Sequence, residues 1–356
     1  MTTQTYRTVA PALQRHYGVE LRGITHFTHE RPLATDAAPS YAPVTAPNNG
    51  IPAIVGSTID PQVVRALVTP TKAAQIYGEV QKGSRTQRVV YFPFSENSGT
   101  TAAYGDFSQA GATGANVNWE PRETFIYQTW IKYGDLETEM MGEASVSWIN
   151  ELRTSAVMTL NKRANLISLF GIDGKNVRGA LNDPDLPPAI SPTPKAGAQS
   201  GKTVTSWAET GDPIAIFGDV QELFRRLNAQ LQGLIDTNSE LVLVIPSELS
   251  NVLTYTNSFG ITLSDILKKS FPNMTIETLP EAGPAMAGGN GGITQRIIQL
   301  FAKAIDGVET VFTAFSSKLI MHRLETYSTS YRQKASQGSS GTVWRRPMAC
   351  ATMIGV

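Results

Sequence analysis

Cysteine is almost absent from this chain, which has 356 residues and only Cys350. A disulfide framework within the chain is therefore excluded, as is typical of proteins that fold in a reducing compartment. The N-terminal residues lack the apolar core of a secretory signal. No run of about 18 apolar residues, the length that a transmembrane helix needs, occurs anywhere in the sequence. We therefore expect a protein that is cytosolic when made and has no membrane partner.

Charge is also scarce. Charged residues make up 17% of the chain, below the usual quarter or so. The 30 basic and 30 acidic residues give a net charge of zero. A neutral surface promotes self-association and argues against a dedicated nucleic-acid-binding face. The composition therefore suits a protein that covers much of its surface with neighbours.

No set of residues matches a catalytic, cofactor or metal site. The pair His26-x-x-His29 lies in a proline-rich segment without the further ligands of a zinc site. The stretch around Lys175 follows a helical pattern instead of opening one, unlike a phosphate loop. The glycine run Gly288–Gly292 opens no helix, so a mobile tip explains it better than nucleotide binding. We expect no enzyme activity, no cofactor and no metal, and a buried Cys350 that is not a nucleophile.

The first 134 residues predict an arm followed by a hairpin. Residues 1–60 are rich in proline and lack helical periodicity, which favours an extended arm over a domain. Strand-like patterns follow at 85–96 and 123–135. The segment 97–118 between them is small, polar and dotted with glycine. These patterns predict a β-hairpin with an unusually long polar tip, and a loop of that length is usually functional or disordered.

One long helix is predicted at 136–170. Its length of about 35 residues far exceeds the usual 11–12, and it would span roughly 50 Å. Asp135 is a suitable N-cap and Gly171 a suitable residue just after the C-terminus. The apolar stripe consists of Met141, Ala144, Trp148, Ile149, Leu152, Ala156, Leu160, Ala164, Ile167 and Phe170. So long a helix needs an extended surface to lie against, which favours a shell-building protein over a compact enzyme.

The second half of the chain predicts an α/β-like subdomain after a proline-rich linker at 184–204. Asp212-Pro213 begins one helix, and Thr262 with Asp265 begins another. Strands are expected at 241–246, 274–279 and 295–305. The remaining C-terminal segment is rich in strand-forming residues and ends apolar, so we expect it to lie within a sheet.

Arg345 and Arg346 follow Trp344 near the C-terminus. Such a group can stack on a base or bind a phosphate. More often it caps the end of a strand or pairs across an interface, and sequence-specific reading of nucleic acid is not expected.

The order of these parts resembles the major capsid protein of tailed bacteriophages (the Hong-Kong-97-type fold). The most specific pieces are Gly171–Pro184, which reads G-x-D-G…G-x-x-N-x-P, and the closing RRPMACATMIGV. The resemblance implies an α+β fold with an N-terminal arm and an extended E-loop hairpin that lies over a neighbouring subunit. It also implies a peripheral domain with a long spine helix, and an axial domain that packs around the local symmetry axis.

On this resemblance the chain divides into five parts. They are the arm (1–70), the E-loop hairpin with its flanks (71–134, the loop itself at 84–128), the peripheral domain with the spine helix (135–204), the axial domain (205–315) and the returning strands of the peripheral domain (316–356). The candidate assembly residues are Arg85, Arg88, Tyr104, Asp106, Phe107, Trp119, Trp148, Arg153, Gly171, Gly288, Arg345 and Arg346. Covalent crosslinking through Lys82 is not expected, because nothing places an asparagine and a glutamate against it.

The function implied is a structural subunit of a virion capsid, made in the host bacterial cytoplasm. It would assemble with itself into hexamers and pentamers of an icosahedral shell around double-stranded DNA, which it contacts non-specifically. Portal, scaffold or decoration proteins are the further partners implied. Three alternatives stay open: an encapsulin-like shell around a protein cargo, an enzyme with a glycine-rich lid, and a tail or fibre adhesin.

Overall fold

The computed structural model describes residues 71–356 apart from 105, 107–108, 144–146, 198–201 and 285–294. The chain forms two compact units. Leu136–Trp148 belongs to one of them, and the other comprises the described residues of Thr69–Asp135 and Ile149–Val356. The arm expected at 1–70 lies outside the described residues, as do two candidate assembly residues, Phe107 and Gly288.

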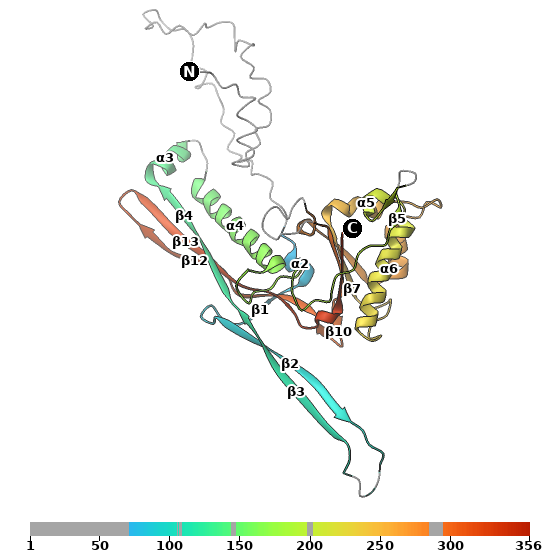
Figure 1. Cartoon of the computed structure of the whole chain (residues 1–356). Helices are drawn as coiled ribbons and strands as arrows, with labels where there is room; N and C mark the ends of the chain where they lie inside the picture. Colours follow the sequence, from blue (N-terminus) through green and yellow to red (C-terminus); the bar gives the residue numbers. More distant parts are fainter. Residues whose placement is uncertain (1–70, 105, 107–108, 144–146, 198–201, 285–294) are drawn as a thin grey trace, which may run out of the picture. The chain divides into compact units, whose positions relative to one another are not determined.

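The larger unit contains a four-stranded sheet in the order β1-β12-β13-β4 (Figure 1). Its bounds are β1 Glu79–Gln81, β4 Phe125–Gly134, β12 Val311–Thr326 and β13 Ser330–Trp344. β1 is parallel to β12, whereas β12, β13 and β4 are antiparallel. Along β4, Tyr127, Ile131 and Tyr133 are buried, while Ile126 and Trp130 are exposed. This alternation gives the sheet one face that packs against the core and one that faces outward.

Helix α4 (Trp148–Phe170) covers the inward face of this sheet. Leu160 and Ile167 of α4 form a buried cluster with Tyr127 of β4 and Ala335 of β13. The buried residues of α4 lie in its second half, from Ala156 onward. The buried contacts that we expected along the whole apolar stripe therefore occur in the C-terminal half of the helix.

The prediction of one continuous helix at 136–170 is wrong. The structure has two helices, α3 (Asp135–Glu143) and α4, and Ser147 lies outside both. α3 has no buried residue that could stabilise it by packing. Gly142 and the sequence Ser145-Val146-Ser147 have low helix propensity, and a serine directly before a helix is a favoured N-cap.

A long antiparallel hairpin consists of β2 (Val89–Thr100) and β3 (Ala112–Glu123). Its second strand is not the predicted segment 123–135, most of which is β4 and pairs with β13. Half of the supposed polar tip belongs to β2 and β3 instead. The error arose because β3 is exposed over nearly its whole length, so its sequence lacks the apolar alternation of a half-buried strand.

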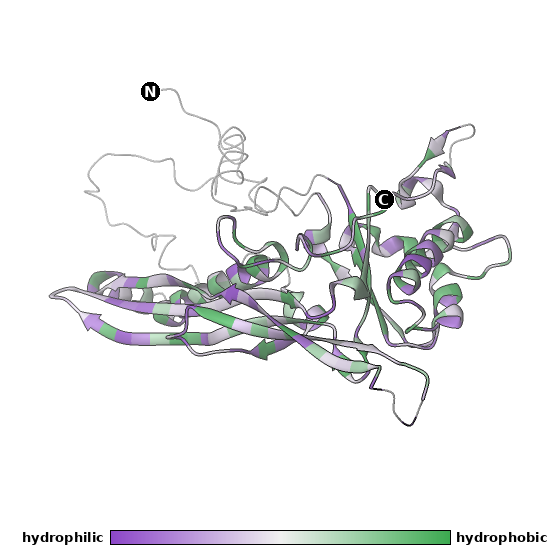
Figure 2. Ribbon diagram, turned by 60° about the horizontal axis from the view of Figure 1, so that its bottom comes forward, coloured by the Kyte–Doolittle hydropathy of each residue, from purple (hydrophilic) through white to green (hydrophobic). Residues whose placement is uncertain are grey.

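The second sheet has the order β14-β9-β7-β8. Its bounds are β7 Leu241–Pro246, β8 Met274–Leu279, β9 Ile297–Ala302 and β14 Cys350–Ile354. Helices α6 (Pro213–Gln230), α7 (Leu263–Ser270) and η2 (Ser247–Thr254) pack on it and share its largest hydrophobic cluster. Figure 2 shows hydrophobic strands beside helices with mixed faces. Both expected helix starts are present: Asp212 accepts from Ile214 N, and Thr262 from Asp265 N.

The pairing of the C-terminal strand differs from one predicted domain boundary. Residues 316–356 were expected to return together as strands of one domain, but β14 pairs with β9 of the second sheet. β14 is the edge strand of that sheet and is almost wholly buried, because Ala351 and Met353 belong to one hydrophobic cluster and Cys350 belongs to another. The C-terminus therefore joins the sheet of the 205–315 segment.

Short elements complete the unit. They are α2 Ala73–Tyr77, β5 Lys195–Ala196, β6 Thr203–Val204, α5 Trp207–Thr210, η3 Pro280–Ala282, β10 Ala304–Ile305, β11 Val308–Glu309 and η4 Pro347–Ala349. A second buried cluster links α2 and the end of α4 to β7 and β9. The two sheets therefore share a continuous interior.

Candidate assembly surfaces

The β2–β3 hairpin has two unlike faces. Residues opposite one another in an antiparallel pair lie on the same face. On one face, Phe92 is buried against Phe312 of β12, with ring centroids 5.9 Å apart. Val90 and Phe94 pack partly on the same cluster. This face attaches the base of the hairpin to the first sheet.

The opposite face carries a stripe of apolar side chains that nothing in the described chain covers. In the register, Tyr91 faces Pro121 and Pro93 faces Trp119. Tyr91 is 60% exposed and Trp119 is 58% exposed. We call this surface the outer hairpin stripe, and its members are Val89, Tyr91, Pro93, Val117, Trp119 and Pro121. Contiguous exposed apolar surface on a soluble subunit marks an interaction site.

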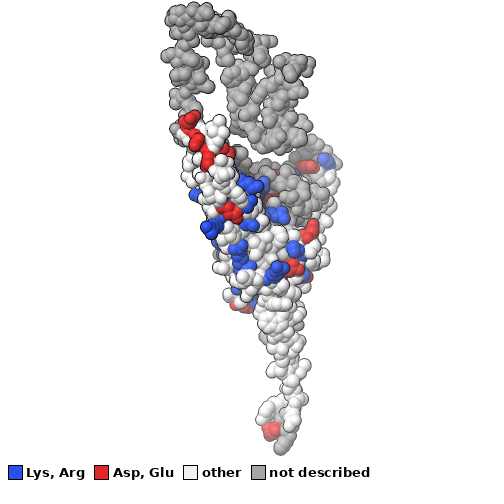
Figure 3. Space-filling model, turned by 90° about the vertical axis from the view of Figure 1, so that its left-hand side faces the viewer, with Lys and Arg blue, Asp and Glu red and all other residues white. Residues whose placement is uncertain are grey.

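Charge is sparse over the outer part of the hairpin. Asp106 is the one charged residue of the segment 97–119. Figure 3 shows this extension as nearly uncharged, in contrast to the mixed charges on the rest of the described surface that is in view. Tyr104, near the tip, is 93% exposed. A hairpin of this kind can approach a neighbour with little cost from desolvating charge.

A buried ion cluster holds the base of the hairpin. Arg122 of β3 is 1% exposed, and its Nη2 lies 2.7 Å from Glu120 Oε1 and 3.4 Å from Asp183 Oδ2. Arg178 Nη1 donates to Asp183 Oδ1 at 3.1 Å and also bonds Asp185. Among the described residues, Arg122 Nε and Nη1 have no hydrogen-bond partner. The cluster ties β3 to the turn that follows α4.

Burial dominates the electrostatics of this cluster. It raises the pKa of Glu120 despite the nearby charges of Arg122 and Arg178. Burial also lowers the pKa of Arg122, although Glu120 and Asp183 oppose that shift. Both directions mean that removing the Glu120 and Arg122 charges from water costs more free energy than their ion pairs contribute.

The turn after α4 is built on close backbone contacts. Gly171 has φ +68°, which suits the residue just after a helix. At Gly179 a Cβ atom would lie 2.2 Å from Leu169 O, so no other residue fits. Asn182 Nδ2 donates to Phe170 O at 2.8 Å and satisfies a free carbonyl at the helix end. These contacts bring Asp183 to the hairpin base.

The other candidate assembly residues are scattered over the molecule. Arg85, Arg88 and Arg153 are exposed. Trp148 begins α4 and is half-buried. Only Trp119 among the predicted residues belongs to the outer hairpin stripe.

Arg345 and Arg346 serve the subunit's own fold. The Arg345 guanidinium lies 4.7 Å from the ring centroid of Phe312. Arg346 Nη1 donates to Ile305 O at 3.1 Å and lies 3.5 Å from Asp306. Both sets of contacts lie within the described subunit, directly after the end of β13.

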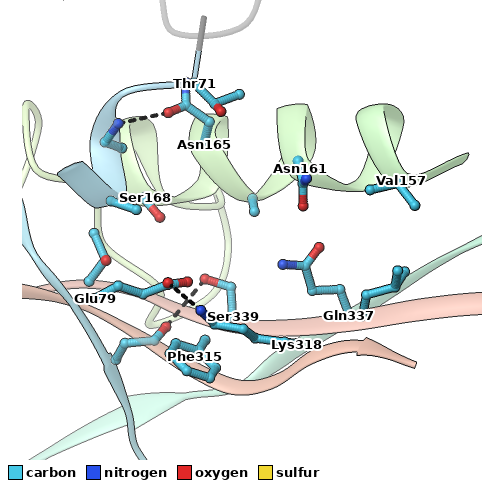
Figure 4. A pocket seen from close by; sticks show the side chains of 17 residues that line it. Thr71, Glu79, Val157, Asn161, Asn165, Ser168, Phe315, Lys318, Gln337 and Ser339 are labelled. Carbon is cyan, nitrogen blue, oxygen red and sulfur yellow. Dashed lines mark hydrogen bonds and ion pairs between the residues drawn. The ribbon is translucent and has the colours of Figure 1, made fainter. Parts of the chain in front are cut away.

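A groove of about 370 Å³ lies between α4 and the first sheet (Figure 4). Lys318 and Glu79 form an ion pair of 2.8 Å at its edge. Gln337 points into the space, and its Oε1 has no partner among the described residues. The remaining lining mixes apolar residues with serine, threonine and asparagine in nearly equal measure.

Two further findings bear on function. Among the described residues, no group of three or more histidine, cysteine or acidic side chains is arranged to hold a metal ion. Within the same part of the chain, no helix has the length and apolarity needed to cross a membrane. Cys350 is buried, and burial raises its pKa to about 12, so the thiol stays protonated at neutral pH.

A model of the Pa193 gp26 major capsid protein family matches residues 42–355. The chain belongs to this family. It is thus a phage major capsid protein, a structural component of the virion shell that assembles with other copies. No curated protein sequence matches it.

Solved structures share the fold at low sequence identity. The capsid of Myoviridae phage XM1 is 13% identical with a TM-score of 0.68, covering 87% of this chain and all of that one. The capsid of a native GTA particle is 12% identical with a TM-score of 0.54, at the same coverage. A chain of Gordonia phage Cozz is 12% identical with a TM-score of 0.53, covering 84% of this chain and 91% of that one. The capsid fold expected from the order of parts is confirmed.

Sequence reasoning missed the ion cluster at the hairpin base. Asp183 lay within the quoted motif Gly171–Pro184, but its partner Arg122 lies 61 residues earlier. One signal was available, since Glu120 and Glu123 flank Arg122 in the sequence.

Proposed function

We propose that this capsid protein forms hexamers and pentamers of an icosahedral shell around double-stranded DNA, and that the hairpin lies on a neighbouring subunit through the outer hairpin stripe. The observation that carries the proposal is the unlike burial of the two hairpin faces. One face is fixed to the subunit through Phe92, and the other presents Tyr91 and Trp119 to solvent. A fixed aromatic surface loses little entropy on binding.

In this proposal the first sheet with α4 forms the peripheral domain, and the second sheet with α6 and α7 forms the axial domain. DNA contact is sparse and non-specific, because the chain is neutral. Portal, scaffold and decoration proteins are the further partners proposed. The role is structural, with no reaction catalysed.

Trp119→Asp tests the stripe. A carboxylate buried in an apolar interface should cost at least about 2 kcal/mol per contact, or roughly 30-fold in association. We expect the variant to melt like the wild type but to form no shells in negative-stain images. Asn118→Asp is the matched control, because it adds the same charge one residue away on the other hairpin face.

The control also keeps the side-chain oxygen that accepts from Trp119 N at 2.8 Å. Shells from Trp119→Asp at wild-type concentration would refute the role of the stripe. The cargo is a separate question: nuclease-resistant DNA inside purified shells supports a genome container, whereas an enclosed protein would overturn that part of the proposal.

A further inference from the structure

The groove between α4 and the first sheet contains a buried hydrogen-bond acceptor that the described subunit leaves without a donor. Gln337 of β13 is 7% exposed, and its Oε1 has no partner among the described residues. Its side chain points into the groove (Figure 4). A buried acceptor without a donor costs about 1–3 kcal/mol. A ligand that donates a hydrogen bond to Gln337 in this groove would recover that free energy.

A second side-chain amide faces Gln337 across the groove. Asn161 is exposed and projects from α4 toward Gln337 (Figure 4). A primary amide offers both N–H donors and a carbonyl acceptor, the groups that a peptide backbone also presents. The two amides on opposite walls can therefore pair with the N–H and C=O groups of an extended peptide that lies between them.

The rest of the groove favours a ligand without charge. Among the residues that line it, Glu79 and Lys318 are the only charged pair, and they neutralise each other at 2.8 Å. Val157, Phe315 and Leu319 form apolar parts of the wall that suit aliphatic side chains. The volume of about 370 Å³ lies within the range of about 300–1,000 Å³ that is typical of ligand sites. A short, uncharged stretch of polypeptide matches these walls.

The chain itself contains a segment of this chemistry. Residues 37–59 read AAPSYAPVTAPNNGIPAIVGSTI and carry no charged side chain. The alanine, valine and isoleucine residues suit the apolar walls, and every residue other than proline supplies a backbone N–H donor of the kind that Gln337 Oε1 lacks. Thr71, the first described residue, lines the same groove. The part of the chain that contains this segment therefore joins the described structure at the groove.

We propose that this groove binds residues 37–59 of a neighbouring subunit as an extended peptide. The inference rests on the proposed shell function and adds a second contact between its subunits. An extended chain spans at most about 3.3–3.6 Å per residue, so the link from Ile59 to Thr71 reaches roughly 40 Å and can cross to an adjacent copy. Exchange of an identical segment between subunits is a low-cost way to add interface.

Substitutions in the groove separate binding from folding. Gln337→Leu replaces the unpartnered acceptor with an apolar side chain of similar size, so it should keep or raise Tm. The variant also loses the hydrogen bond to the bound segment, so the subunit concentration needed for shells should rise about 3- to 10-fold. Val157→Phe narrows the groove and should block assembly. Met158→Phe is the matched control, because it adds the same ring at the next residue of α4, outside the groove lining.

Two results of these measurements would overturn the proposal. A lower Tm for Gln337→Leu would show that the amide is satisfied within the subunit. Assembly of Val157→Phe at the concentration that suffices for Met158→Phe would show that the groove stays empty in the shell.

Disulfide trapping tests the occupant directly. One population of chains carries Val157→Cys, and a second is a set of chains that each carry one added cysteine between residues 37 and 59. Oxidation of a mixture of the two populations should give disulfide-linked heterodimers at one or more positions of the segment. Met158→Cys in place of Val157→Cys is the control and should give none. Cys350 is buried and does not interfere.

The trapping result is independent of shell formation. Absence of heterodimers along the whole segment overturns the contact, and so does a chain with both cysteines that links only within itself. Heterodimers beside a wild type that forms no shells would overturn the proposed function alone.

Discussion

The ion cluster at the hairpin base allows a quantitative prediction, because its buried aspartate has more hydrogen-bond partners than its buried arginine. Asp183 has three donors: Arg122 Nη2 at 3.4 Å, Arg178 Nη1 at 3.1 Å and Asp185 N at 3.1 Å. Two nitrogen atoms of Arg122, Nε and Nη1, have no hydrogen-bond partner among the described residues. Its contact with Glu120 Oε1 is short but outside hydrogen-bond geometry. The carboxylate is therefore well satisfied, whereas the guanidinium is not.

The two single substitutions should differ for this reason. Asp183→Ala leaves a buried arginine with one poorly aligned partner, and we expect a loss of about 3–5 kcal/mol in the free energy of unfolding. Arg122→Met removes a charge that was already undercompensated and fills its volume with an apolar chain. Asp183 keeps Arg178 and a backbone donor, so the expected loss is only about 1–2 kcal/mol.

Urea unfolding of the subunit, followed by tryptophan fluorescence, measures both losses. The double variant should lose at least about 1 kcal/mol less than the sum of the single losses, because the two residues contact each other. If Arg122→Met costs as much as Asp183→Ala, the unpartnered N–H groups are not the weakness that we infer. If the losses simply add, Arg122 and Asp183 are not coupled.

Two further predictions concern the interior. Burial raises the pKa of Glu281, whose Oε1 accepts from Asn165 Nδ2 at 2.6 Å and whose Oε2 has no described partner. Stability from a raised carboxyl pKa is present at low pH and lost as pH rises through the folded-state pKa. The Tm of the wild type relative to Glu281→Gln should therefore rise between pH 7 and pH 5, and a constant difference would contradict this. Gly179→Ala forces a Cβ to within 2.2 Å of Leu169 O and should lower the free energy of unfolding by at least about 2 kcal/mol. Gly218→Ala has open space around the added Cβ and should raise Tm by about 1–3 °C. Equal effects of the two alanine substitutions on stability would refute the packing argument.

The parts of the fold that follow local rules could be predicted from the sequence. The strands at 241–246 and 274–279 are continuous apolar or alternating segments, and both are present at those bounds. The helix starts at Asp212 and Thr262 follow from side-chain capping, which acts over two or three residues. Such features depend on neighbours in the chain and not on the tertiary structure.

The parts that depend on distant partners could not be predicted in this way. β3 is exposed over most of its length, so no apolar alternation marks it as a strand. β14 pairs with β9 in a sheet other than the one that receives β12 and β13. The outer hairpin stripe becomes visible only when the register sets Tyr91 and Trp119 on one face. The sequence order of parts thus indicates the family, while the surfaces that assemble come from tertiary pairing.

The central claim is that this subunit builds a closed shell, and direct imaging tests it most sharply. Purified protein, expressed with and without scaffold, is examined by negative-stain electron microscopy over a range of concentrations. The account predicts closed, regular shells for the wild type and dispersed folded subunits for Trp119→Asp. A wild-type protein that stays strictly monomeric at high concentration under both conditions would contradict it.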